Sequence, residues 1–236
     1  MINLQQLKET HFLVHDLPDE PVLDLNRPHI WFCNLDENQE LKVDWHSILS
    51  RDELALAARL KNSLERRRFV NRSVFVRKVL GNLAGIAPEK VEYCLGPKGK
   101  PKLVNSIGIN GEHMTRLNFN ISHTENILAL AVAFNKEVGI DLEVINPSLD
   151  FFAIAKIHFT PDDLYLLRSL QQSKALLGFY RLWTCKEALA KMHGSGITSW
   201  SAVESGTDSQ CILYSFELNL DQKEIVGALV VGCETY

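Results

Sequence analysis

The feature that most constrains the fold of this 236-residue chain is a short pattern that occurs twice, 110 residues apart. Residues 50–54 read Ser-Arg-Asp-Glu-Leu and residues 160–164 read Thr-Pro-Asp-Asp-Leu; a Ser cap followed by Glu three residues later is typical of a helix start. An amphipathic stretch follows each copy and ends near glycine, Gly85 or Gly194. Three pairs of positions correspond at the same offset: Leu60 with Leu170, Phe69 with Phe179, and Arg77 with Glu187. The recurrence predicts two similar halves.

Other segments have the β-branched and aliphatic content of strands. They cover residues 29–34, 119–121, 128–134, 138–145, 212–219 and 224–231, with a further strand and loop expected within 91–106. A tight turn joins 128–134 to 138–145, and the last two segments read as a hairpin. Two long helical stretches combined with short neighbouring strands predict the α+β class.

Composition indicates a soluble globular protein, because 46% of the residues are hydrophobic and 23% are charged. No apolar run approaches the roughly 20 residues that span a membrane, and the N-terminus lacks a basic region followed by an apolar core. The five cysteines are odd in number and show no C-x-x-C spacing, which favours reduced thiols. We therefore expect a cytoplasmic protein.

The net charge of −4 is unevenly distributed along the chain. Residues 66–102 contain ten Lys or Arg against two acids, Glu89 and Glu92, an excess of eight positive charges that leaves the rest of the chain at −12. A basic band on a net acidic protein favours a discrete anionic ligand, although a solvated helix face remains the alternative for any single residue. We expect no nucleic acid partner, because no recognised binding motif or aromatic ladder is present.

Two stretches supply acidic side chains and a cation of the kind that binds a phosphate together with a metal ion. Residues 138–143 read as a strand on which Asp141 and Glu143 point to the same face. In the helix that follows, Glu187 and Lys191 are spaced i, i+4 and share one stripe. An all-oxygen set suits Mg²⁺, whereas zinc would require His or Cys. The alternatives are a solvated edge strand and an ordinary helical ion pair.

The order of motifs in the chain resembles that of a known family. Residues 139–143 (G-I-D-L-E) are followed after about forty residues by 183–191 (W-x-x-K-E-A-x-x-K), and they are preceded by 99–101 (G-K-P) and 119–123 (F-N-I-S-H). This arrangement resembles the Sfp-type 4'-phosphopantetheinyl transferases over nearly the whole chain.

The resemblance implies an α+β pseudo-dimer of two related halves. Each half is a small, mostly antiparallel sheet packed with a long helix, and the active site lies in the cleft between the halves. We expect the halves to cover residues 1–110, the basic side, and 111–236, which carry the acids. A monomer would then be sufficient.

The resemblance also implies the roles of individual residues. Three acids would hold Mg²⁺: Asp141, Glu143 and Glu187. Seven residues would contact coenzyme A: Ser122 and His123 at its phosphates, Lys100, Arg72 and Arg77 around the adenosine 3'-phosphate, and Lys186 and Lys191 on the acid-bearing helix. Lys191 shares the Glu187 stripe and is favoured for phosphate, whereas Lys186 points about 100° away and serves either ligand or surface. Glu187 and Lys191 would be catalytic, Glu187 as ligand, base, or both in turn. Trp183 is expected to pack at the cleft.

The activity implied is transfer of 4'-phosphopantetheine from coenzyme A to a serine of an acyl or peptidyl carrier protein, with release of 3',5'-ADP. The alternatives are a Mg²⁺-dependent phosphohydrolase acting on coenzyme A or a nucleotide, and a binding module without chemistry. A nucleophilic pair formed by Cys185 and His193 is a rival that lacks a third orienting group. The sequence does not distinguish among Arg66, Arg67 and Arg68 as ligand contacts, and it does not identify the carrier.

Overall fold

The structure, a computed structural model, describes residues 13–15, 24–37, 44–96, 99–104, 107–109, 113–194, 211–220 and 222–234. Its first sheet has the strand order β1-β2-β8-β7, and β1 is parallel to β2 while the other pairs are antiparallel. The bounds are Leu13–His15 for β1, His29–Asn34 for β2, Leu117–Thr124 for β7 and Ile127–Phe134 for β8. The predicted strand at 29–34 is confirmed, and the one at 119–121 is longer than predicted.

The second sheet is antiparallel, with the order β10-β11-β9. Its strands are β9 (Lys136–Val144), β10 (Ile212–Leu220) and β11 (Lys223–Glu234), so the predicted C-terminal hairpin is confirmed. Two small hairpins complete the described strands: β3 (Tyr93–Leu95) with β4 (Pro101–Leu103), and β5 (Ile107–Ile109) with β6 (His113–Thr115). Residues 97–98 and 105–106 of the strand and loop predicted within 91–106, and Asp221 between the two strands of the C-terminal hairpin, lie outside the described residues.

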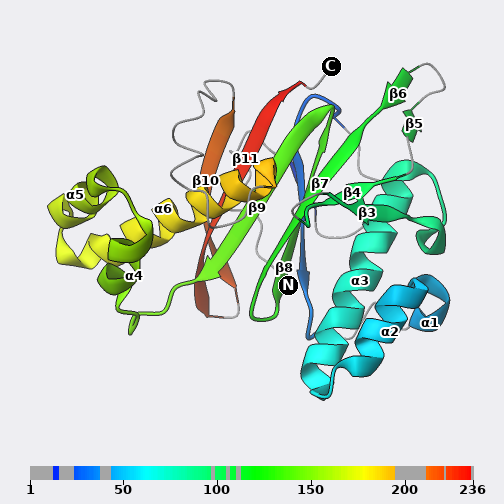
Figure 1. The fold of residues 1–236 in the computed structure, drawn as a ribbon, viewed down its shortest axis with the longest axis horizontal. Helices are drawn as coiled ribbons and strands as arrows, with labels where there is room; N and C mark the ends of the chain where they lie inside the picture. Colours follow the sequence, from blue (N-terminus) through cyan, green and yellow to red (C-terminus); the bar gives the residue numbers. More distant parts are fainter. Residues whose placement is uncertain are drawn as a thin grey trace.

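The helices form two groups on opposite sides of the strands (Figure 1). One group is α1 (Trp45–Ile48), α2 (Arg51–Arg59), α3 (Ser63–Ala84) and the short 3₁₀ turn η2 (Pro88–Lys90). The other is α4 (Phe151–His158), α5 (Pro161–Ser169) and α6 (Gln172–His193). In the described part of the chain, no helix is long and apolar enough to cross a membrane. The expected α+β class is confirmed as a mixture of helices and mainly antiparallel sheets.

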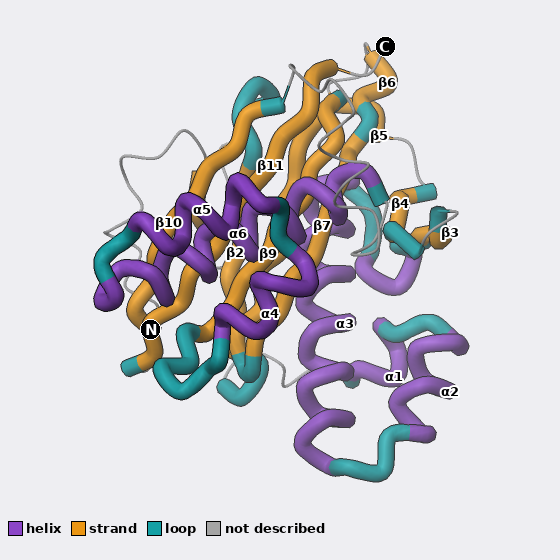
Figure 2. The backbone as a smooth tube through the Cα atoms, turned by 60° about the vertical axis from the view of Figure 1, so that its left-hand side comes forward, coloured by secondary structure: helices purple, strands orange, loops and turns teal. Residues whose placement is uncertain are grey.

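The layers follow from the alternation of side chains along β8, which is buried throughout. Its odd-numbered residues, such as Ala129 and Ala131, pack with β9, β10 and β11 between the two sheets. Its even-numbered residues, such as Leu128 and Leu130, pack against α3. On the far side of the second sheet, β11 packs against α6. The order of layers is therefore α3, first sheet, second sheet, α6, and Figure 2 shows the helices outside the strands.

The sheet order places the change between sheets later in the chain than expected. Strands β7 and β8 fall within residues 111–236, the predicted second half, yet they pair with β2 in the first sheet. The chain enters the second sheet only after the tight turn at Asn135, whose φ is +55°. The sheets thus divide at residue 135 and not at residue 110, because β2 completes its sheet with strands that come about 100 residues later.

The repeated pattern corresponds to two helix pairs with the same local construction. Both α2 and α5 begin with a capping box, formed by Ser50 with Glu53 in one and by Thr160 with Asp163 in the other. Both α3 and α6 have 22 residues and end at a left-handed glycine. The first stretch was predicted as one continuous helix, but it breaks before α3, where Asn62 accepts hydrogen bonds from two backbone N–H groups and caps a new helix.

The offset between the long helices is 109 residues, one fewer than between the short helices, because the connection before α6 is shorter. By helix position, Arg77 therefore corresponds to Lys186, and Lys78 corresponds to Glu187. The contacts agree with this alignment. Arg77 Nε lies 2.7 Å from Glu53 of the first capping box, and Lys186 Nζ lies 2.9 Å from Asp163 of the second. The expected correspondence of Arg77 with Glu187 is corrected accordingly.

Candidate active site

The site is built on a seam between β7 and β9, the facing edges of the two sheets. Strand β9 forms backbone hydrogen bonds with β11 along one edge, and side chains of β7 form hydrogen bonds with the backbone of its other edge. Alternate residues of β7 face β9, and the side chains of three of them accept hydrogen bonds from backbone N–H groups of β9. Asn120 accepts from Ile140 at 3.0 Å, Ser122 from Leu142 at 3.2 Å, and Thr124 from Val144 at 3.3 Å. This ladder fixes Ser122 beside the acid strand.

Asp141 lies at the centre of the seam and is 5% exposed. Its Oδ1 accepts hydrogen bonds from Lys191 Nζ at 2.7 Å and from Ser122 Oγ at 3.0 Å. Its Oδ2 is buried and has no hydrogen-bond partner within the residues that the structure describes. Burial raises the pKa of Asp141, and the neighbouring Lys191 and Ser122 oppose that rise. The carboxylate is thus only half satisfied by the protein.

Glu143 and Glu187 complete an acidic group around Asp141. Burial, reinforced by the negative charge of Asp141, raises the pKa of each to about 7. A hydrogen bond with Trp183 acts in the opposite direction on Glu143, so Trp183 contacts the site as well as packing with Phe179. The polar role of Trp183 was not predicted; its spacing of four residues before Glu187 was the available signal.

Gly139 explains how the acid of α6 comes close to the acids of β9. A Cβ at this position would lie 2.0 Å from the carbonyl oxygen of Ala188 and 2.5 Å from the backbone nitrogen of Met192. The α6 backbone therefore passes directly over the strand at the one residue without a side chain. Glu187 and Lys191 are the chain neighbours of the two contacted residues, so the contact sets their distance from Asp141.

The donor set fits a divalent cation that keeps part of its own coordination shell. In the described ranges, no group of three or more His, Cys, Asp or Glu side chains is placed so that it could hold a metal ion. However, Asp141 Oδ2 and Glu187 Oε1 are both buried without a partner there, which marks two carboxylate oxygens that lack a cation or donor. Mg²⁺ usually binds through one or two carboxylates together with waters and substrate phosphates, so a partial cluster suits it.

A pocket of about 620 Å³ adjoins the acids and takes walls from both sides of the seam. Its lining includes Arg72 of α3, Ser122 and His123 of β7, and Lys191 of α6, together with Asp141 and Glu143. Arg72 lies over the ring of Phe69 at 5.1 Å, and within the described part it forms no ion pair. Burial lowers the pKa of Arg72, and partial burial, together with the charges of Arg72 and Lys191, lowers that of His123. This end of the pocket is suited to an anion.

Three predicted ligand contacts lie outside this pocket lining and have protein partners instead. Arg77 is 3% exposed and donates to Glu53 and to the carbonyl oxygens of Pro88 and Val91. Lys186 pairs with Asp163. Arg77 and Lys186 thus tie each long helix to the short helix before it. Sequence could not show these ion pairs, because the acid partners, Glu53 and Asp163, lie more than twenty residues away.

Lys100 is the third of these residues. Its Nζ donates to Glu137 Oε2 at 2.6 Å and to the carbonyl oxygens of Val138 at 3.1 Å and Met192 at 2.6 Å. Burial lowers the pKa of Lys100, while the contact with Glu137 counteracts the effect. The residue joins the β3–β4 hairpin to the start of β9 and the end of α6, so its ammonium is held by the protein at the edge of the site.

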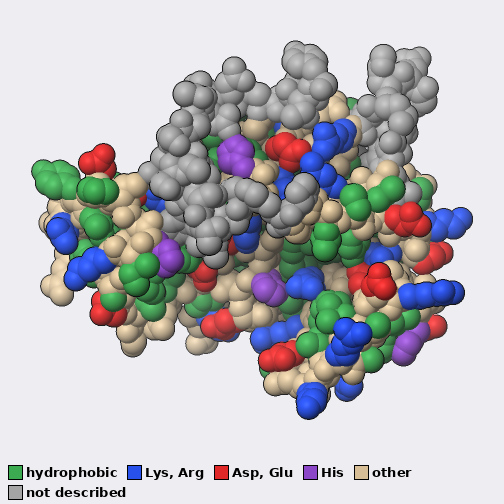
Figure 3. Space-filling model, viewed as in Figure 1, with side chains coloured by type: hydrophobic (Ala, Val, Ile, Leu, Met, Phe, Trp, Pro, Cys, Tyr) green, Lys and Arg blue, Asp and Glu red, His purple; other side chains and the backbone are tan. Residues whose placement is uncertain are grey.

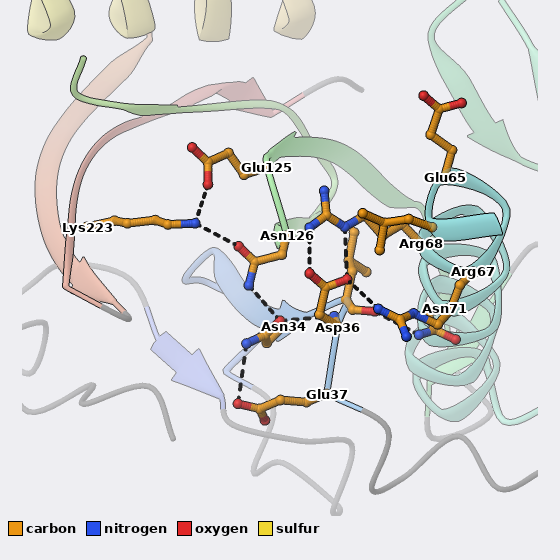
Figure 4. Close-up of polar contacts among 12 residues, drawn as sticks. Asn34, Asp36, Glu37, Glu65, Arg67, Arg68, Asn71, Glu125, Asn126 and Lys223 are labelled. Carbon is orange, nitrogen blue, oxygen red and sulfur yellow. Dashed lines mark hydrogen bonds and ion pairs between the residues drawn. The ribbon is translucent and has the colours of Figure 1, made fainter. Parts of the chain in front are cut away.

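The basic band is also partly neutralised within the protein. Lys and Arg side chains gather over α2 and α3 on the face shown in Figure 3. Arg68 forms two hydrogen bonds with Asp36, and Arg67 contacts the same carboxylate at 3.3 Å. Figure 4 shows this cluster beside a second set of contacts in which Asn34 and Asn126 connect to Lys223. Arg67 and Arg68 therefore anchor α3 to the end of β2, whereas Arg66 is exposed.

The rival nucleophile pair is not supported by the surroundings of Cys185. Burial raises the pKa of the Cys185 thiol to about 11, and the charge of Asp141 adds to the rise. A thiol of this kind is protonated at neutral pH and is a poor nucleophile. Cys185 packs instead against Ala188 and Met192 of its own helix and against β11.

Known proteins are similar to this chain in sequence. Residues 137–224 match the family described as the 4'-phosphopantetheinyl transferase superfamily. The chain is 37% identical over 190 residues to the 4'-phosphopantetheinyl transferase HetI of Nostoc sp., covering 80% of this chain and 78% of the relative. It is 31% identical over 174 residues to a putative 4'-phosphopantetheinyl transferase of Synechocystis sp. (74% and 68% covered), and 30% identical over 177 residues to the 4'-phosphopantetheinyl transferase AcpT of Salmonella typhi (74% and 83% covered). The chain therefore belongs to the 4'-phosphopantetheinyl transferase superfamily and is an enzyme of that class.

Proposed function

We propose that this enzyme transfers 4'-phosphopantetheine from coenzyme A to the serine hydroxyl of an apo acyl or peptidyl carrier protein. The serine oxygen bonds to the β-phosphorus, the bond from that phosphorus to the bridging oxygen breaks, and 3',5'-ADP leaves with the oxygen. The observation that carries the proposal is the pocket itself, in which acids of β9 adjoin cations of α3 and α6. Acids and cations that line the same pocket suit a pyrophosphate that is bound with a metal ion.

The anion-binding end of the pocket supports a place for the phosphates. Arg72 offers a planar guanidinium that can bind phosphate through two parallel hydrogen bonds, and it has no acid partner in the described ranges that would compete. His123 lies on the same wall. Apolar lining from Leu56 and Phe69 provides a surface for the adenine ring. Arg77, Lys100 and Lys186 are omitted from this assignment because the protein already holds their charged groups.

Asp141, Glu143 and Glu187 would hold Mg²⁺. The buried, unpaired oxygens of Asp141 and Glu187 support this, and Glu143 lines the pocket beside Asp141. A bound Mg²⁺ ion would neutralise the negative charge that develops on the departing phosphate. The protein residues orient the reactants around it. Ser122 is fixed by the backbone of β9, and Lys191 provides a point cation for the transferring phosphoryl group.

The serine proton must leave as the oxygen attacks, and Glu187 is the group we assign to receive it. Its Oε1 has no hydrogen-bond partner within the described residues, so no described protein group competes with the proton for that atom. Glu187 cannot be a tight ligand and a free base at the same moment, so the two roles alternate or one of them passes through a bound water.

We also propose that the two halves are related and divide near residue 135. The paired capping boxes, the equal lengths of α3 and α6, and the equivalent pairs Arg77–Glu53 and Lys186–Asp163 support this relationship. A single chain then supplies both walls of the site, so a monomer is sufficient for activity.

One incubation tests the function and separates it from the alternatives. Apo carrier protein, coenzyme A and Mg²⁺ are mixed with the enzyme, and the carrier is followed by intact-protein mass spectrometry. A gain of one phosphopantetheine, absent when the carrier serine is replaced by Ala, supports transfer. Loss of coenzyme A with an unmodified carrier would instead indicate a phosphohydrolase. If neither the carrier nor coenzyme A changes, the result would support a binding module without chemistry.

A further inference from the structure

Lys191, Asp141 and Ser122 form a closed triangle of polar contacts. Lys191 Nζ donates to Asp141 Oδ1 at 2.7 Å and to Ser122 Oγ at 3.0 Å, and Ser122 Oγ donates to the same Oδ1 at 3.0 Å. A buried carboxylate requires a positive charge or several donors, and Lys191 provides the charge. The residue expected to bind substrate phosphate is therefore engaged with a residue expected to bind the cation.

This contact is open to exchange from the pocket. The Lys191 side chain is 30% exposed, against 7% for the Asp141 side chain, and both residues line the pocket. Lysine carries its ammonium on a flexible four-carbon stem, so Nζ can turn without movement of α6. Asp141 and Ser122 are held on strands, and Ser122 keeps its hydrogen bond from the Leu142 N–H in either arrangement. Lys191 is the mobile member of the triangle.

The charges around the triangle favour a stronger cation. Asp141, Glu143 and Glu187 interact electrostatically with one another and with Lys191. When all three carboxylates are ionised, they leave two negative charges in excess over the one ammonium. A single divalent ion matches that excess, and its charge would repel an ammonium in contact with the same oxygen.

We propose that Lys191 is the resident counter-ion of Asp141, and that a divalent cation displaces it from Oδ1 and frees its ammonium for the anionic ligand in the pocket. The inference rests on the proposed function, because it takes the three carboxylates as the cation site. It adds a coupling between two binding events. Cation binding releases the Lys191 ammonium toward the anion. Conversely, an anion that attracts the ammonium draws it away from Asp141, and the cation can then bind there.

The proposal predicts an unusual effect of removing a positive charge. Lys191→Met and Lys191→Gln take away the competing ammonium, so each variant should bind Mn²⁺ alone about tenfold or more tightly than the wild-type protein. Lys191→Arg keeps the charge and should bind Mn²⁺ about as the wild type does. The measurement is a Mn²⁺ titration without coenzyme A at about pH 8, above the raised pKa of about 7 of Glu143 and Glu187, with free Mn²⁺ followed by electron paramagnetic resonance.

The matched control is Lys174→Met, which removes a positive charge from an exposed position of the same helix. Its Mn²⁺ affinity should equal that of the wild type, which excludes a general effect of net charge. Circular dichroism establishes that each variant is folded. Equal or weaker Mn²⁺ binding by folded Lys191→Met and Lys191→Gln would overturn the proposal, as would an equal gain in Lys174→Met.

The Mn²⁺ titration and the transfer assay test separate proposals, so either proposal can be rejected without the other. Transfer by the wild-type enzyme without tighter Mn²⁺ binding in the Lys191 variants would overturn the counter-ion role and keep the proposed function. Tighter Mn²⁺ binding in those variants, without transfer by the wild type to any carrier, would keep the counter-ion role and reject the function.

Discussion

Gly139 shows how one missing side chain controls the geometry of the site. Because a Cβ there would meet backbone atoms of α6 at 2.0 and 2.5 Å, Gly139→Ala should push the helix away from β9. We expect a loss of about 1–3 kcal/mol in the free energy of unfolding, measured by urea denaturation, and a fall in transfer rate.

Gly232→Ala is the control in the same sheet, because the nearest atom to its new Cβ would be 3.4 Å away, in ordinary contact. It should change neither quantity appreciably. A Gly139→Ala protein with wild-type stability and wild-type transfer would contradict the role given to this glycine.

The acids make a second prediction at the residue scale. Asp141→Ala and Glu187→Gln should abolish transfer while the protein stays folded, because each removes a carboxylate charge from the site. Glu217→Gln changes an exposed acid on β10 and should leave transfer intact. The measurement is the mass gain of the carrier over time, and normal turnover in either site variant would reject the assignment.

Single residues also show what the sequence could and could not predict. Alternation placed Asp141 and Glu143 on one face of a strand, and helical spacing placed Glu187 on the same stripe as Lys191, because both depend on local geometry. The contact between Lys191 and Asp141 spans 50 residues and depends on how α6 packs on β9. No local pattern encodes such a contact.

At the scale of elements, the two helix pairs depend on buried ion pairs. Arg77 lies where three acceptors converge, so Arg77→Met leaves Glu53 and two carbonyl groups without their donor. Removing one partner of a buried pair typically costs about 3–5 kcal/mol of unfolding free energy, and we expect a loss of that order in urea denaturation. Arg66→Met, on the exposed face of the same helix, should cost less than about 0.5 kcal/mol. Comparable losses in the two variants would contradict the structural role of Arg77.

The same pair gives a pH dependence. Burial acts to raise the pKa of Glu53, but hydrogen bonds from Tyr93 and the Ser50 N–H, with the charge of Arg77, hold it below its ordinary value of 4.5. A lowered folded pKa means that ionised Glu53 stabilises the protein above pH 4.5, and that this stabilisation is lost as pH falls through the folded pKa. The stability difference between wild type and Glu53→Gln should therefore be constant near neutrality and shrink below pH 4.5. A difference that stays constant into strong acid would exclude the effect.

Elements were predicted well where caps and turns mark them. Residues 50 and 160 were recognised as helix starts because a capping box is a local sequence pattern. The break before α3 was missed, since Asn62 is a cap that occurs within a continuous amphipathic pattern. The one-residue difference in offset comes from the shorter connection before α6, and it decides whether Arg77 corresponds to Glu187 or to Lys186.

At the scale of the whole molecule, the site depends on contacts between distant parts of the chain. The β7–β9 seam brings the Ser122 segment beside the acids, and Lys100 joins the β3–β4 hairpin to both β9 and α6. Sequence predicted two halves with a boundary near residue 110, but it could not predict that β2 pairs with β8, because nothing local encodes that pairing. Family resemblance supplied the activity, and the structure identified which predicted cations face the pocket.

The central claim is that one pocket combines the acids of β9 with Arg72 of α3, His123 of β7 and Lys191 of α6. Its most direct test is a crystal structure with coenzyme A and Mn²⁺. The anomalous signal of Mn²⁺ locates the ion. We predict a peak bound to Asp141 and to Glu143 or Glu187, the pyrophosphate beside Lys191, and the 3'-phosphate at Arg72 and His123. A Mn²⁺ peak away from these acids, or coenzyme A bound outside this pocket, would contradict the account.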